Sequence, residues 1–206
     1  MELQLALDML DTDRALSLAH QTAPWIDIIE VGTPLLKHEG VMVVKKLASA
    51  FPGKTIVVDT KTMDVGAYEA EFCFDAGCHV MTVLGVADDA TIAGAVECAQ
   101  KYNGRVLVDL INVPDKIGRA QQVEQLGAHI LGVHSGIDQQ RRGHTPLDDL
   151  RSVRCVTNMA VAVAGGINID SIDAIVAECP DVIIVGGAIT GAEYSAAATK
   201  AIKERI

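Results

Sequence analysis

The chain has 206 residues, of which 50% are hydrophobic and 3% aromatic, and its formal net charge at pH 7 is −10. This length suits one domain with a substantial core. The acidic balance argues against a nucleic-acid partner, and no apolar run reaches the roughly 18 residues of a membrane span. Five scattered cysteines and the lack of a secretion signal predict a cytoplasmic protein with reduced thiols.

Short β-branched runs alternate with segments of helical length along the whole chain. The predicted strands are residues 3–8, 26–30, 55–59, 79–83, 105–109, 130–134, 161–164 and 182–185. The predicted helices are residues 12–22, 40–51, 66–75, 89–102, 114–125, 146–153, 169–178 and 192–204. Strands that are apolar on both faces favour parallel pairing with helices outside the sheet.

Such an alternation is typical of a closed barrel or of an open doubly wound sheet. A GxGxxG motif after the first strand would favour the open sheet, but residues 8–11 read Asp-Met-Leu-Asp. Eight units in roughly 200 residues leave no room for insertions in a barrel. We therefore predict an α/β fold, a single-domain (β/α)8 TIM barrel over residues 1–206, with its function at the carboxyl ends of the strands.

An Asp-x-Lys-x-x-Asp cluster, formed by Asp59, Lys61 and Asp64, follows the third predicted strand. Glu30 ends the strand before it, and Glu30 with Asp59 makes a candidate Mg²⁺ site because hard cations take one or two carboxylates and keep several waters. Lys61 is a candidate donor to a developing enolate oxygen. The alternative is that the acids cap loops while Lys61 only neutralises them.

Three further polar residues end predicted strands, namely Asp8, Asp109 and His134. His134 is a candidate general acid or base because imidazole titrates near neutrality, although a lone histidine is more often structural. Arg141 and Arg142 follow it. They form either a solvated loop pair or a lid that reaches a phosphate, and the sequence leaves both interpretations open.

Two glycine pairs end the last two predicted strands, Gly165-Gly166 and Gly186-Gly187. Phosphate sites on barrels are commonly built after strands seven and eight and at a short helix N-terminus. Tight turns are the alternative for either pair alone, but the corresponding positions of both pairs favour phosphate. The residues together predict a phosphosugar enzyme with Mg²⁺-assisted enolate chemistry.

The Asp-x-Lys-x-x-Asp motif resembles the mark of the orotidine monophosphate decarboxylase suprafamily. Within it, the chain resembles the 3-hexulose-6-phosphate synthase family nearly end to end, at residues 27–35, 61–64, 82–85, 88–96, 108–111 and both glycine segments. This resemblance implies a reversible, Mg²⁺-dependent aldol reaction. Formaldehyde and D-ribulose 5-phosphate would give D-arabino-hex-3-ulose 6-phosphate through an enediolate.

The resemblance also implies roles for the candidate residues. Glu30 and Asp59 would bind the metal, and His134 would form the enediolate from the ketose. Lys61 and Asp64 would polarise the substrate and relay protons. In this suprafamily the residue equivalent to Asp64 reaches into the partner's site, so the resemblance implies a homodimer with shared active sites.

The remaining candidates would contact the substrate. Asp8 would bind sugar hydroxyls or hold Lys61, and Asp109 would join the substrate site. By the same resemblance the phosphate would be seated by Gly165, Gly166, Gly186 and Gly187.

The close alternative is 3-keto-L-gulonate 6-phosphate decarboxylase, which shares the scaffold and the enediolate. That family carries arginines where this chain has Ile137 and Gly187, and these differences favour the synthase. A non-catalytic phosphosugar-binding barrel would not need Lys61, Asp64 and His134 together. A Schiff-base aldolase would want a lysine among apolar groups, whereas Lys61 lies between two acids, which hold it protonated.

Overall fold

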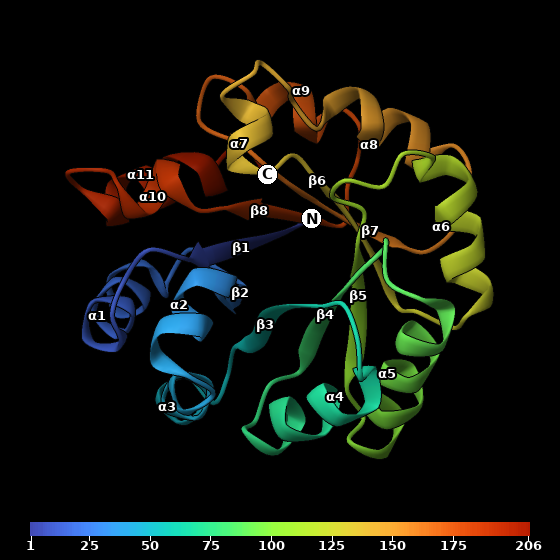
Figure 1. Cartoon of the computed structure of the whole chain (residues 1–206). Coiled ribbons are helices and arrows are strands. Elements are labelled where there is room, and N and C mark those ends of the chain that lie inside the picture. The colour runs from blue at the N-terminus through green and yellow to red at the C-terminus, as the bar shows by residue number, and fades with distance from the viewer.

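The computed structural model describes residues 1–206 and shows a closed barrel of eight parallel strands with helices outside it (Figure 1). The strands pair in sequence order, and the last strand closes the barrel against the first. This architecture confirms the predicted (β/α)8 barrel. The strands are β1 Glu2–Leu7, β2 Ile28–Val31, β3 Thr55–Thr62, β4 Val80–Leu84, β5 Arg105–Asp109, β6 Ile130–His134, β7 Ala160–Ala164 and β8 Val182–Val185.

Every predicted helix is present, with ends that shift by a few residues. These helices are α1 Thr12–Thr22, α3 Met42–Ala50, α4 Gly66–Asp75, α5 Asp89–Lys101, α6 Lys116–Gln125, α8 Leu147–Arg154, α9 Ile172–Val176 and α11 Ser195–Lys203. Three further helices follow strand ends directly and are too short to give a periodic sequence pattern, namely α2 Thr33–Glu39, α7 Ile137–Gln140 and α10 Gly187–Thr190. None of the helices combines the length and apolar character that crossing a membrane requires.

Two apolar cores form on opposite sides of the strands. Alternate residues of β1, such as Leu3 and Leu5, point outward into the large core beneath the helices, because successive strand side chains face opposite ways. A smaller inner cluster fills the barrel near the amino ends of the strands and consists of Ile28, Val57, Val80, Leu107, Ile130, Ala162 and Val182. This inner cluster is the floor on which the cavity at the carboxyl ends rests.

One hydrogen-bond pattern repeats four times around the barrel, at the amino ends of the strands. The residue just before each even-numbered strand accepts, through its side chain, the N–H of the second residue of the preceding strand. The four pairs are Asp27 with Leu3 at 2.8 Å, His79 with Ile56 at 3.0 Å, His129 with Val106 at 3.1 Å and Asp181 with Val161 at 2.8 Å. Each capping residue also donates its own N–H to the carbonyl of the same partner. The barrel floor is therefore built from four equivalent two-strand units.

Two of these caps depend on a neutral imidazole. A ring nitrogen accepts a hydrogen bond only when it carries no proton, and the Nδ1 atoms of His79 and His129 both accept backbone N–H groups. Burial, followed by the charge of Arg105, lowers the pKa of His129. Because the folded state disfavours the imidazolium, protonation of His129 opposes folding.

We predict that the contribution of His129 to the free energy of unfolding decreases as the pH falls below about 6.5, the ordinary histidine value. There the unfolded chain binds a proton that His129 in the folded chain does not. The variant His129→Asp copies the caps Asp27 and Asp181, so between about pH 7 and about pH 5 its free energy of unfolding should shift in favour of the folded state relative to that of wild type. Urea unfolding at several pH values measures this difference. The exposed His144→Asp is the control, and equal pH dependence of His129→Asp and wild type would contradict the prediction.

Candidate active site

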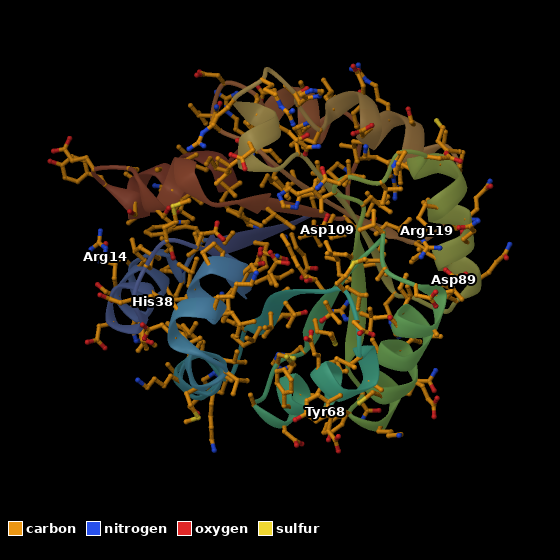
Figure 2. The ribbon with its side chains drawn as sticks, in the orientation of Figure 1. Arg14, His38, Tyr68, Asp89, Asp109 and Arg119 are labelled. Atoms are coloured by element: carbon orange, nitrogen blue, oxygen red, sulfur yellow. The ribbon has the colours of Figure 1, made fainter.

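One cavity of about 670 Å³ opens at the carboxyl ends of the strands, above the inner apolar cluster. The volume of this cavity lies in the range of small-molecule sites. Figure 2 places Asp109 near the centre of the ring of strands. Apart from Asp64, every site residue predicted from the sequence lines the cavity: Asp8, Glu30, Asp59, Lys61, Asp109, His134, Gly165, Gly166, Gly186 and Gly187.

Lys61 enters the cavity because β3 is irregular near its end. The pairing with β4 shifts register between Val58 and Thr62, and Lys61 has a φ of 48°. This left-handed backbone costs a non-glycine residue roughly 1–3 kcal/mol. The Thr82 hydroxyl offsets that cost, because it accepts the N–H of Lys61 at 2.9 Å and donates to Asp59 Oδ1 at 2.7 Å.

A single oxygen of Asp109 joins the lysine to the histidine. Asp109 Oδ2 accepts hydrogen bonds from Lys61 Nζ at 3.1 Å and from His134 Nδ1 at 2.9 Å, while Oδ1 accepts the N–H of Ile111. Burial alone would raise the pKa of Asp109, but the hydrogen bond and charge of His134, with the charge of Lys61, lower it to about 2. The ionised carboxylate keeps the proton of His134 on Nδ1, and this leaves Nε2 free to accept one.

Lys61 is held as an ammonium. Its Nζ lies 2.6 Å from Asp59 Oδ2. Burial opposes the charge, but Asp59 and Asp109 together raise the pKa of Lys61. A protonated amine donates hydrogen bonds and does not attack a carbonyl, so the Schiff-base alternative does not suit this environment.

The carboxyl groups of Asp8, Glu30 and Asp59 also line the cavity near Lys61, the only lysine or arginine that lines it. Burial, then the charges of Asp59 and Asp8, raise the pKa of Glu30 to about 8. Burial and the charge of Asp59 likewise raise the pKa of Asp8. A divalent cation bound among these carboxyl groups would favour their ionised forms. No group of three or more histidine, cysteine or acidic side chains is arranged as a complete metal site, and two carboxylates match Mg²⁺, which keeps several waters.

The glycines of the two predicted pairs differ in their surroundings. A Cβ on Gly165, whose φ is 119°, would lie 2.4 Å from the Ser135 carbonyl oxygen, so this position requires glycine for the turn. A Cβ on Gly186 would lie 3.3 Å from Asp8 Oδ2, whereas one on Gly187 would meet open space. Close packing therefore explains why residue 165 is glycine, and it limits the side chain that position 186 can hold. Position 187 is open, so glycine there leaves room for a ligand.

Asp64 and the two arginines lie outside this cavity. Asp64 is exposed, and its Oδ1 accepts the N–H of the neighbouring Val65 at 2.7 Å. Arg141 pairs with Asp138 at 3.0 Å, and Arg141 and Arg142 are both exposed. In this structure the arginines are a solvated pair on the surface, and a single chain leaves Asp64 away from the other site residues.

Residues 1–202 match the family model described as Orotidine 5'-phosphate decarboxylase / HUMPS family. The chain belongs to this family. A relative from Methylomonas aminofaciens, described as 3-hexulose-6-phosphate synthase, is 46% identical over 97% of this chain and 96% of its own. The crystal structure of 3-hexulose-6-phosphate synthase from Salmonella typhimurium is 41% identical, with a TM-score of 0.98 over 100% of this chain and 98% of its own.

A more distant structure is 3-keto-L-gulonate-6-phosphate decarboxylase from Vibrio cholerae. It is 30% identical, with a TM-score of 0.87 over 99% of this chain and 96% of its own. Membership of the Orotidine 5'-phosphate decarboxylase / HUMPS family confirms the resemblance that the Asp-x-Lys-x-x-Asp motif predicted.

Sequence reasoning missed several polar side chains that line the cavity of this family member. Gln4 and Thr33 are buried and bond to Glu30 and Asp59 respectively. Gln140 donates to the Ser135 carbonyl from the short helix α7. The sequence did contain a signal for Gln4, because a glutamine inside an apolar parallel strand must bury its amide and therefore needs a polar partner. The other two lie after strand ends, where polar residues are common.

We predict that Thr82→Val destabilises the protein by about 1–3 kcal/mol, because the partly buried N–H of Lys61 loses its acceptor. Thr199→Val is the matched control. It removes an equally buried hydroxyl that donates only to a carbonyl in its own helix. Urea unfolding of both variants measures the difference, and equal stability losses would show that the Thr82 hydroxyl does not secure Lys61.

Proposed function

We propose that the protein is a 3-hexulose-6-phosphate synthase, which condenses formaldehyde with D-ribulose 5-phosphate to D-arabino-hex-3-ulose 6-phosphate in a reversible aldol reaction. The observation that carries the proposal is the Asp109 carboxylate, shared by Lys61 and His134 beside the Glu30 and Asp59 pair in one cavity. Greater similarity to relatives described as this synthase than to the decarboxylase supports it.

Proton removal from the ketose is the first task of these residues. His134 Nε2, free of a partner in the chain, takes the proton from C1 of ribulose 5-phosphate. Asp109 stabilises the imidazolium that forms, since it already holds Nδ1. Lys61 donates to the oxygen on C2 as negative charge develops there, and a fixed charge in a dry site is effective in this role.

Glu30 and Asp59 would hold Mg²⁺ at the cavity wall, where acids outnumber the single lysine. Bound there, the ion would supply positive charge to neighbouring sugar oxygens. Thr33 and Thr82 donate to the two oxygens of Asp59 at 2.8 Å and 2.7 Å, and these contacts fix the orientation of that carboxylate.

Bond formation returns the proton to the product. The carbon at C1 attacks the carbonyl carbon of formaldehyde, a new C–C bond forms, and the electron pair of the C=O bond moves to oxygen. That oxygen takes the proton from His134, so the histidine ends in its starting state and no other reactant is consumed. The reverse sequence cleaves the hexulose phosphate.

The substrate would lie across the cavity between the acids and the glycine pairs. Gly166, Gly186 and Gly187 line the cavity, and there backbone N–H groups without bulky side chains can approach a phosphate. Asp8, raised in pKa by burial and by Asp59, would bind sugar hydroxyls as a donor or an acceptor.

A second copy of the chain would complete the site. Met63, Val65, Tyr68 and Phe72 are exposed on both sides of Asp64 and on α4, and Figure 2 shows Tyr68 on the outside of that helix. An exposed apolar face of this kind marks an association surface. Pairing two such faces by two-fold symmetry would bring Asp64 toward the partner's cavity. The five unpaired cysteines support a reducing cytoplasmic location.

The decarboxylase alternative has weaker support. Ile137 and Gly187 line the cavity where that family carries arginines, and Lys61 is the only lysine or arginine there. A cavity without these cations suits an uncharged aldehyde better than a substrate carboxylate.

We predict EDTA-sensitive consumption of formaldehyde in the presence of ribulose 5-phosphate and Mg²⁺, with little CO₂ release from 3-keto-L-gulonate 6-phosphate. His134→Asn should lower kcat by roughly 10²–10⁴-fold, the usual contribution of a general acid or base. The exposed His144→Asn serves as control. Dominant decarboxylation, or no condensation by wild type, would contradict the proposed reaction.

We also predict that two inactive variants complement each other. In a mixed dimer of Lys61→Ala and Asp64→Ala, one of the two sites keeps both residues. Random reassembly of equal amounts should therefore restore about a quarter of wild-type activity, given closed two-fold symmetry. Mixing after mild denaturation and renaturation measures it. Activity no higher than that of the separate variants would contradict the shared site.

A further inference from the structure

Gln4 is a buried amide in an apolar layer. It lies on the inward face of β1, below Ala6 and Asp8, and only 2% of it is exposed. The inner cluster around this depth is entirely aliphatic. Burying an amide without a partner costs about 1–3 kcal/mol, so the position of Gln4 demands a specific contact.

That contact is with Glu30. Gln4 Nε2 donates to Glu30 Oε2 at 2.6 Å, and the Glu30 side chain receives no other hydrogen bond in the chain. Ala6 pairs with Glu30 in the β1–β2 register, and its small side chain leaves room for Gln4 to reach up from two residues earlier. Asp59, by contrast, accepts from three side chains, so its orientation does not depend on a single donor.

The second oxygen of Glu30 faces the cavity. No fully buried side-chain oxygen lacks a hydrogen-bond partner, and Glu30 Oε1 has none, so it is open to solvent in the cavity that Glu30 lines. One oxygen is thus anchored from the floor while the other stays accessible from the cavity. This is the geometry of a carboxylate prepared for a ligand.

We propose that Gln4 is a positioning residue that fixes Glu30 Oε2 so that Oε1 is presented to a divalent cation. The inference rests on the proposed function, in which Glu30 and Asp59 hold Mg²⁺. Without the amide, the Glu30 side chain is free to rotate. Binding of the cation must then also supply the free energy that orders this side chain. Contacts that orient metal ligands typically change affinity by about 10–100-fold when lost.

The test uses Mn²⁺ as the probe and the purified, metal-free protein without substrate. Gln4→Met keeps the length and volume of the side chain but removes its donor, and Gln4→Leu is a second variant in case the first does not fold. Thr22→Val is the matched control, because it removes a buried hydroxyl in α1 that donates to Leu18. Free Mn²⁺ measured by electron paramagnetic resonance gives the dissociation constants.

We expect the Gln4 variants to bind Mn²⁺ about 10–100-fold more weakly than wild type, and Thr22→Val to bind as wild type does. Unchanged affinity in a folded Gln4 variant would overturn this inference alone. Failure of the wild type itself to bind Mn²⁺ would overturn both this inference and the metal assignment. An equal loss in Thr22→Val would show that lost stability, and not the contact with Glu30, weakens binding.

Discussion

The chemistry of the cavity depends on one carboxylate oxygen. Asp109 Oδ2 accepts from both Lys61 and His134, and these contacts keep Asp109 ionised despite its burial. The same charge, together with that of Asp59, holds Lys61 protonated, and it sets the proton of His134 on Nδ1. In the proposed reaction, Asp109 thus links the donor for a developing oxygen to the acceptor for a carbon-bound proton.

The barrel makes this concentration of charge possible. Acids at or just after the ends of β1, β2, β3 and β5 meet because the carboxyl ends of parallel strands converge on one opening. Burial is the larger cause of the raised pKa values of Glu30 and Asp8, and repulsion by the neighbouring acids is the next. A rigid aliphatic floor, capped below by four equivalent side-chain contacts, resists the outward relaxation that would separate these charges.

The sequence predicted the barrel and most of the charged side chains and glycines at its mouth, because strand ends can be recognised in the sequence and must converge in a closed parallel sheet. It predicted Asp109 only as a substrate contact, and that role stays a prediction. The contacts of Asp109 with Lys61 and His134 depend on the side-chain rotamers of these residues and on the irregularity of β3, which a sequence pattern does not reveal. The sequence did not predict the short helices α2, α7 and α10, because they are too short to give a periodic pattern. Asp64 lies outside the cavity, and its placement rests on the proposed second copy.

The most direct test of this account is exchange of the C1 proton of ribulose 5-phosphate with deuterated solvent, followed by NMR with Mg²⁺ and without formaldehyde. Wild type should exchange that proton stereospecifically. His134→Asn should abolish the exchange, and Asp109→Asn should slow it strongly, because the amide neither stabilises the imidazolium nor fixes its tautomer. Exchange at the wild-type rate in either variant would contradict the central role of the shared Asp109 oxygen.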